Sequence, residues 1–227
     1  GDRVFVTHHV PCNNCKYCLE DNHTACEALH TGNFEPGGFS EYVRVPKINV
    51  DFGTFLLPNN VSYEEGTFIE PLACVVRAHR IIDIKKNHKV LVLGSGVSGL
   101  LNIMYAKHLG AEVAATDIDD YKLKKANEFG ADKTIYGNNY FEYKADKIIV
   151  CAGVMQAIKQ AFKNIDRKGT ILLFAIPQED IKLPNLDIWR NEITITSSYG
   201  AAPKDLEESL KEIKDKKINV NGLVTQR

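Results

Sequence analysis

Four of the six cysteines lie close together in the chain, and their spacing is the first indication of chemistry. The cluster consists of Cys12, Cys15, Cys18 and Cys26. Four soft sulfur ligands at such short spacings suit a tetrahedral Zn²⁺ ion. Because a shell of four thiolates leaves no position open for a substrate, the expected role of this zinc is structural.

A [4Fe–4S] cluster is the alternative occupant, because the first three spacings also match an iron–sulfur run. In that run the fourth cysteine follows after three residues and precedes a proline. Here the last gap is seven residues and Cys26 precedes Glu27. The spacing therefore favours zinc, and the colour of the purified protein distinguishes the two metals.

A glycine-rich segment, Gly94-Ser-Gly-Val-Ser-Gly99, follows one predicted strand and opens a predicted helix. In a dinucleotide-binding loop, Gly94 permits the tight turn, Gly96 lets a pyrophosphate approach the backbone, and Gly99 lets helix and strand pack closely. The helix that starts at Val97 presents its free N–H groups to the pyrophosphate. We therefore predict that Gly94, Gly96, Val97 and Gly99 bind a cofactor.

Asp117 stands 23 residues after Gly94, at the end of the next predicted strand. A carboxylate at this place accepts hydrogen bonds from the ribose hydroxyls of NAD and repels the 2′-phosphate of NADP. No arginine lies in residues 117–122, so the sequence favours NAD. Asp119 is predicted to be a helix N-cap rather than a ligand.

These loops need a scaffold of alternating strands and helices. Continuous apolar runs predict buried strands at 89–93, 112–116, 147–151, 170–174 and 192–196. Helical periodicity fills 97–109, 121–129 and 154–165 between them. The pattern predicts an α/β fold with a doubly wound parallel Rossmann sheet. The span 130–147 is short for a full crossover, so its helix is expected to be absent or reduced to a turn.

Residues 1–82 are rich in loops, with short β-like runs such as 41–45. Ser62 followed by Glu65 predicts a capping box at a helix start, and Pro71 suits the first turn of a second helix. The C-terminal segment contains an amphipathic helix with apolar residues at Leu206, Leu210 and Ile213.

Charge and hydropathy exclude several classes of partner. The 227 residues contain 28 Lys+Arg and 29 Asp+Glu, a formal net charge of −1. This balance provides no basic surface for nucleic acid or an anionic membrane. No apolar run approaches the roughly 20 residues of a membrane span. We therefore expect a cytoplasmic protein with a small-molecule partner.

Together these features resemble the zinc-dependent medium-chain alcohol and polyol dehydrogenases, in particular the branch of sorbitol and threonine dehydrogenases. The resemblance covers nearly the whole chain in the family's order. Besides the cysteine cluster and the glycine loop with Asp117, it rests on four further segments: Gly-Asp-Arg-Val at 1–4, Gly-Gly-Phe-Ser-Glu-Tyr at 37–42, Ile-Glu-Pro-Leu at 69–72 and Leu-Val-Thr-Gln-Arg at 223–227.

The resemblance implies a division into three parts. Residues 1–82 would be a partial, loop-rich β GroES-like catalytic domain that carries the structural zinc lobe. Residues 83–200 would be the NAD-binding Rossmann domain. Residues 201–227 would hold the final helix of the cofactor domain and the return toward the catalytic domain. The family also suggests a homodimer or homotetramer.

The implied activity is hydride transfer between NAD and a secondary alcohol: a polyol, a sugar alcohol or a 3-hydroxy amino acid. In the family a second, catalytic zinc acts as a Lewis acid, and Glu70 matches the acidic residue that ligates this zinc or lies beside it. The family's other catalytic ligands lie upstream of the position of Gly1, and its last strands lie beyond Arg227. We therefore expect these 227 residues to bind NAD with negligible turnover.

Two functions of other classes remain open. One is a non-catalytic NAD-binding module, and the other is an iron–sulfur electron carrier with a nucleotide domain.

Overall fold

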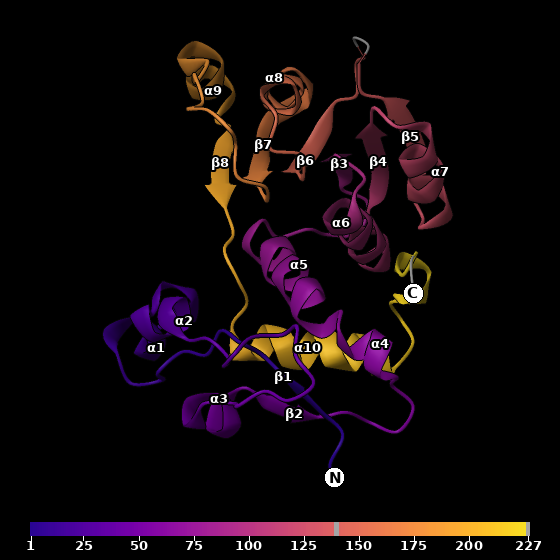
Figure 1. The fold of residues 1–227 in the computed structure, drawn as a ribbon. Coiled ribbons are helices and arrows are strands. Elements are labelled where there is room, and N and C mark those ends of the chain that lie inside the picture. Colours follow the sequence, from indigo (N-terminus) through magenta and orange to yellow (C-terminus); the bar gives the residue numbers. More distant parts are fainter. Residues whose placement is uncertain (139–140, 226–227) are drawn as a thin grey trace. The chain divides into compact units, whose positions relative to one another are not determined.

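The computed structural model describes residues 1–138 and 141–225, and the chain forms two compact units (Figure 1). Unit 1 comprises residues 1–77 and 199–227, and unit 2 comprises residues 78–198.

Unit 2 is built on a six-stranded parallel sheet. Its order is β5-β4-β3-β6-β7-β8, and every neighbouring pair is parallel. The order reverses between β3 and β6, which is the switch point of a doubly wound sheet. The strands are β3 (Lys89–Leu93), β4 (Glu112–Asp117), β5 (Lys133–Tyr136), β6 (Ala145–Val150), β7 (Ile165–Leu173) and β8 (Thr194–Ser197). The predicted parallel Rossmann sheet is confirmed.

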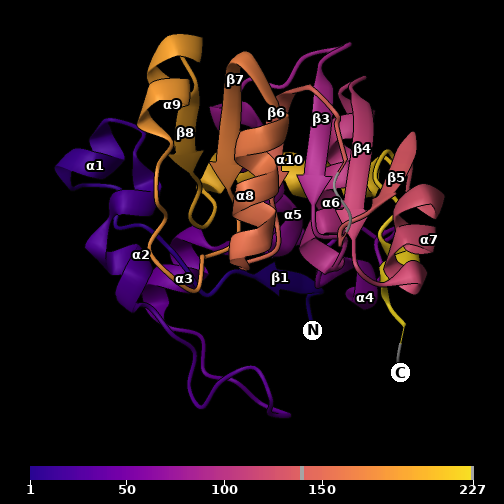
Figure 2. The ribbon, with the colours of Figure 1, turned by 90° about the horizontal axis from the view of Figure 1, so that it is seen from above.

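Helices cover both faces of this sheet. Helix α6 (Val97–His108) contacts α7 (Asp120–Glu128) on one face, and α8 (Met155–Asn164) lies on the other (Figures 1 and 2). The central strand β3 is therefore shielded on both sides, and its residues 90–93 have no exposed surface. This burial explains why the strand is a continuous apolar run in the sequence.

The connection from β5 to β6 contains no helix in its described residues 137–138 and 141–144, as predicted. Two elements of unit 2 were not predicted: the edge strand β5 and the helix α9 (Asn185–Asn191).

Unit 1 consists of short elements. A two-stranded antiparallel sheet pairs β1 (Val4–Val6) with β2 (Thr54–Leu56). The short helices are α1 (Lys16–Leu19), α2 (Glu27–Thr31), α3 (Lys47–Phe52), α4 (Tyr63–Gly66) and the 3₁₀ turns His23–Ala25 and Asn221–Leu223. The prediction of a β run at 41–45 is wrong, because the backbone there makes only one isolated bridge, between Glu35 and Arg44.

The predicted capping box at α4 is confirmed. Ser62 Oγ accepts from the backbone N–H of Glu65 at 3.1 Å, and Glu65 Oε2 accepts from the backbone N–H of Ser62 at 2.9 Å. Oε1 of the same buried carboxylate accepts from Lys216 Nζ at 2.7 Å and forms an ion pair with it. This ion pair and the hydrogen bond from the Ser62 N–H lower the pKa of Glu65. Helix α4 is thereby tied to the C-terminal segment.

Helix α5 (Ile69–Ile81) begins in unit 1 and ends in unit 2, while α10 (Pro203–Lys214) packs in unit 1. Ser209 Oγ in α10 donates to the carbonyl of Ile69 at 2.7 Å. The sequence-based division, with a first part to residue 82 and residues 201–227 in the cofactor domain, stays a prediction beside these two compact units. Leu206 and Ile213, on the apolar side of α10, are buried, and α10 belongs to unit 1.

Across the described residues, the structure has no helix with the length and apolar character that crossing a membrane requires.

Candidate functional site

The glycine loop connects β3 to α6 in unit 2, and its three glycines are constrained in different ways. Gly94 has φ +101°, and a β-carbon there would lie 2.9 Å from the Cβ of Ala152. A β-carbon on Gly99 would collide with the carbonyl oxygen of Gly94. A β-carbon on Gly96 would meet nothing within 4 Å. Gly94 and Gly99 are thus required by packing, whereas Gly96 borders open space.

The first turn of α6 faces this loop. Gly96 is the N-cap residue and Val97 begins the helix, and no side chain caps the free N–H groups. Such groups at a helix start favour an anion, through hydrogen bonding and through the helix dipole. The loop can therefore accept a phosphate group, as the sequence predicts.

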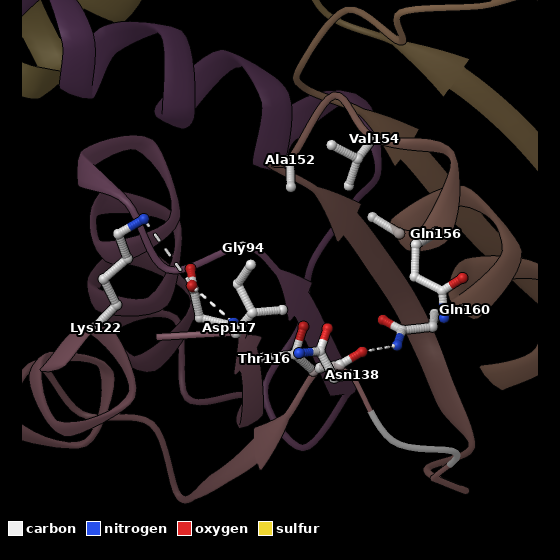
Figure 3. Close-up of a pocket in the computed structure, with 12 residues that line it drawn as sticks. Gly94, Thr116, Asp117, Lys122, Asn138, Ala152, Val154, Gln156 and Gln160 are labelled. Atoms are coloured by element: carbon white, nitrogen blue, oxygen red, sulfur yellow. Dashed lines mark hydrogen bonds and ion pairs between the residues drawn. The ribbon is translucent and has the colours of Figure 1, made fainter. Parts of the chain in front are cut away.

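Asp117 lies at the end of β4, beside the glycine loop (Figure 3). Its Oδ2 accepts from the backbone N–H of Ser95 at 2.8 Å. Its Oδ1 accepts from the backbone N–H of Ile118 at 2.8 Å and of Asp119 at 3.1 Å. These bonds fix the direction of a carboxylate that is only 9% exposed. Asp119 caps α7 by accepting from Tyr121 N–H, which confirms its predicted N-cap role.

A cavity of about 320 Å³ opens between the glycine loop, Asp117 and the start of α8 (Figure 3). It lies at the carboxyl ends of the strands near the switch point, the usual ligand position in open parallel sheets. Its wall combines apolar and polar side chains: Thr116, Asp117, Ile118, Lys122, Asn138, Ala152, Val154, Gln156, Ala157 and Gln160, together with Gly94 and Gly137. This mixture suits a nucleotide, which has a flat base and a polar sugar.

Several residues of this wall were missed by sequence reasoning. Lys122 Nζ lies 4.0 Å from Asp117 Oδ1, so a cation does stand next to the predicted ribose site. Its position in the first turn of α7, five residues after Asp117, is the signal in the sequence that could have indicated it. Gln160 donates to the carbonyl of Gly137 and has no comparable signal, because it comes from a distant helix.

The four clustered cysteines converge in unit 1. Their sulfur atoms all lie within 4.8 Å of one another, and two pairs, Cys15–Cys18 and Cys12–Cys26, are 3.6 Å apart. A tetrahedral zinc with Zn–S bonds of about 2.3 Å places its sulfurs about 3.8 Å apart. The cluster therefore fits a single zinc ion, and a cubic four-iron cluster would need its cysteines farther apart.

Backbone N–H groups near the cluster favour the thiolate form of one cysteine, the form that binds a metal. Although burial disfavours the thiolate, the backbone N–H groups of Cys12 and Leu29 lower the pKa of Cys26 to about 6. Burial raises the pKa of Cys18 to about 12 in the absence of an ion. A bound cation would favour the thiolate form of all four cysteines.

Glu70 lies in the first turn of α5 and does not belong to a metal-binding group in the described part of the chain. The thiol of Cys74 donates to Glu70 Oε1 at 3.2 Å. Burial raises the pKa of Cys74 most, and the negative charge of Glu70 raises it further. His9 is near enough for Glu70 to raise its pKa, although burial and His8 lower it overall. Among residues 1–138 and 141–225, the four cysteines are the one set of three or more potential metal ligands.

Two family models match the chain. A model described as zinc-binding dehydrogenase matches residues 98–215, more than half of the chain. A second, described as alcohol dehydrogenase GroES-like domain, matches residues 1–51.

Among curated proteins, the chain is 30% identical to an alcohol dehydrogenase of Geobacillus stearothermophilus, covering 92% of this chain and 64% of that protein. It is 31% identical to a sorbitol dehydrogenase of Halalkalibacterium halodurans, covering 99% of this chain and 69% of that protein. The chain thus spans about two thirds of the length of these relatives. A Sinorhizobium meliloti structure, described as a zinc-binding dehydrogenase bound to NADP, matches with a TM-score of 0.87 and 26% identity, covering 99% of this chain and 69% of that one.

Proposed function

This chain belongs to the zinc-binding dehydrogenase family. From this premise we propose that it binds NAD in unit 2, holds a structural zinc ion in unit 1, and takes part in the oxidation of a secondary alcohol. The preferred substrates are a polyol, a sugar alcohol or a 3-hydroxy amino acid. The observation that carries the proposal is the cavity that joins the glycine loop to a fixed, nearly buried carboxylate.

Each part of this cavity has a role toward the dinucleotide. The N–H groups at the start of α6, from Gly96 and Val97 onward, would bind the pyrophosphate, and the open space at Gly96 would admit it. Asp117 already accepts three backbone N–H groups, two on Oδ1 and one on Oδ2, and would use its remaining lone pair, on Oδ2, for a ribose hydroxyl. Ile118 and Val154 would contact the adenine ring.

The choice between NAD and NADP depends on two opposite charges. Asp117 would repel a 2′-phosphate, whereas Lys122, 4.0 Å away, would attract one. We favour NAD because the carboxylate is nearly buried and therefore weakly screened, while Lys122 is about half exposed. The NADP seen in the S. meliloti structure makes a direct comparison of both cofactors necessary.

When bound, NAD would supply the hydride acceptor: the carbinol carbon would lose a hydride to it and the hydroxyl proton would be released to solvent, which leaves a ketone. Residues of unit 2 would hold and orient the dinucleotide for this transfer. In unit 1, Cys12, Cys15, Cys18 and Cys26 would hold a zinc ion that maintains the lobe and takes no part in the chemistry. Glu70 is the proposed acidic residue at the catalytic metal, but among the described residues it belongs to no set of three or more potential metal ligands.

Isothermal titration with NAD and NADP, together with metal analysis, tests this proposal. We expect saturable binding of NAD at one site per chain, weaker binding of NADP, and one zinc per chain. Absence of dinucleotide binding would refute the cofactor assignment. A brown, iron-containing protein would instead support the iron–sulfur carrier.

A non-catalytic NAD-binding module is the second candidate. The observation in its favour is that Glu70 accepts from the thiol of Cys74 and, among the described residues, belongs to no set of three or more potential metal ligands. NAD-dependent oxidation of sorbitol, threonine and simple secondary alcohols by the full-length natural protein is the test. A clear rate would exclude the non-catalytic alternative.

Assembly as a homodimer or homotetramer remains a proposal from the family resemblance, and a cytoplasmic location remains a proposal from composition and hydropathy. Light scattering on the purified protein tests the first, and cell fractionation tests the second.

A further inference from the structure

A buried polar pair in unit 2 lies close to the glycine loop. It consists of His79, near the end of α5, and Asn102, in the second turn of α6. His79 is 1% exposed and Asn102 is fully buried. His79 Nε2 lies 2.8 Å from Asn102 Oδ1. Two polar side chains buried this deeply are stable only when they are hydrogen-bonded.

The other bonds of Asn102 determine which atom donates. Its Nδ2 group donates to the carbonyl of Ser98 at 2.8 Å and contacts Cys151 Sγ at 3.5 Å. Because Nδ2 is the donor, Oδ1 is the acceptor, and His79 must carry its proton on Nε2. Burial lowers the pKa of His79 to about 4, so the ring is neutral near pH 7.

Both contacts of Asn102 end on segments that shape the pyrophosphate site. Ser98 lies in the first turn of α6, between Gly96 and Gly99. Cys151 follows β6, and the next residue, Ala152, is the one that restricts Gly94 on the other side of the loop. One buried amide therefore connects the start of α6 to the segment that packs against the tight turn.

The histidine ring is a costly way to fill this space. Its Nδ1 atom is buried and has no hydrogen-bond partner in the described structure. A buried acceptor without a partner opposes folding, and an apolar side chain of similar size would avoid that cost. The contribution that remains specific to His79 is its hydrogen bond to Asn102.

We propose that His79 and Asn102 are positioning residues for the dinucleotide pyrophosphate. Asn102 holds the first turn of α6 and the segment after β6 together, and His79 fixes the orientation of the Asn102 amide. The N–H groups of the glycine loop are thereby aligned before the ligand arrives, which reduces the ordering that binding requires. This inference rests on the proposed function, because it requires a pyrophosphate at the loop.

The test separates phosphate binding from base and ribose binding. The 227-residue chain is titrated with NAD, ADP and adenosine, and the ratio of the ADP and adenosine affinities measures the phosphate contribution. Asn102→Leu is expected to weaken NAD and ADP about tenfold, the effect of about one hydrogen bond, and to leave adenosine unchanged. His79→Leu should act in the same direction, whereas His79→Gln should restore the ratio because its amide N–H can donate to Asn102.

Asn164→Leu is the matched control. Asn164 is also a buried helical asparagine in unit 2, and it accepts from the backbone N–H of Tyr143 at 2.8 Å. It should lower the melting temperature without changing the ADP-to-adenosine ratio. An unchanged ratio in folded Asn102→Leu and His79→Leu proteins would overturn the inference, and so would an equal change in the control. Failure of the unmodified chain to bind both NAD and ADP would instead overturn the proposed function.

Discussion

The parallel sheet and the cysteine lobe hold their candidate sites in different ways. In unit 2 the nucleotide site lies on strands whose backbone and side chains are already buried, and Asp117 is fixed by three backbone N–H groups. In the lobe, α1 and α2 have only four and five residues. The core of the lobe consists of Cys18, Cys26 and Leu29, with the other two cysteines and Ala28 packed against it.

This difference teaches which site needs its ligand in order to exist. Helices of four or five residues have no stability of their own in water. The cysteines of the lobe are at once its core and its ligand set, so a bound ion would provide most of its cohesion. The nucleotide site, in contrast, should be formed before the dinucleotide binds. The following predictions test this contrast, beginning with the largest effect.

Cys26→Ser should separate the two regions most clearly. Structural zinc contributes on the order of 10 kcal/mol to the folding of small zinc domains, so loss of one ligand should unfold the lobe. Hydrogen exchange should show residues 12–31 losing protection while β3 keeps it. Cys151→Ser, a change at a cysteine outside the cluster, is the control and should leave zinc content at one per chain. Parallel loss of protection in β3 would show that the sheet also depends on the metal.

Acid should affect the sheet unit through His79, independently of any metal. The pKa of this buried ring is about 4 in the folded state and near 6.5 when exposed, so the unfolded chain binds more protons between these values. Stability should therefore fall as the pH drops from about 6.5 to 4, by at most about 3 kcal/mol. Denaturant titrations across this range should show a smaller slope for His79→Gln. An identical slope in both proteins would show that His79 does not cause this loss of stability in acid.

Asp117→Asn should weaken NAD binding without disturbing the lobe. Hydrogen bonds to a charged acceptor contribute about 1.5–3 kcal/mol, so the loss should be roughly ten- to a hundredfold. NADP should lose less, because the variant also removes the repulsion of the 2′-phosphate. Asp119→Asn, which keeps a capping oxygen at α7, is the control. A Kd for NAD that stays constant in Asp117→Asn would remove Asp117 from the site.

Lys216→Met should produce the smallest effect, in a part of unit 1 that needs no ligand. Glu65 is nearly buried and its lowered pKa reports the ion pair with Lys216, which is about half exposed. We expect a loss of about 1 kcal/mol at pH 7. Because the folded pKa of Glu65 is depressed, this contribution exists above its unfolded value of 4.5 and disappears as the pH falls through the folded value. Urea unfolding at pH 7 and pH 3 should show the difference from the unmodified chain only at pH 7.

The sequence was sufficient for the elements whose pattern follows from burial. The strand at Lys89–Leu93 is a continuous apolar run and the helix from Val97 has helical apolar periodicity, and both occur as predicted. Strand β5 was missed because its four residues lie at the edge of the sheet and remain partly exposed, so they carry no apolar run. The amphipathic pattern of α10 predicted a helix correctly but could not reveal which unit would cover its apolar side.

The candidate sites show the same limit. Glycine and cysteine spacings could be interpreted locally, because the turn geometry and the ligand set are each encoded within a short segment. Lys122 and Gln160 line one cavity, and Asn102 contacts both His79 and Cys151, although these residues come from helices and strands that are far apart in the chain. No periodicity connects such residues, so only the three-dimensional structure brings them together.

The open space at Gly96 has a consequence for which substitutions this loop tolerates during evolution. Alanine at position 99 or 94 should impair folding, because its β-carbon would collide with neighbouring atoms. Selection for a folded chain should therefore remove both variants. At position 96 the backbone has φ −69° and ψ −171°, which any L-residue adopts, and nothing surrounds the missing methyl group. A library of variants screened only for folding should therefore keep Gly96→Ala, whereas a library screened for NAD binding should lose it. Substitutions at position 96 should therefore be selected against for their effect on NAD binding and not for an effect on folding.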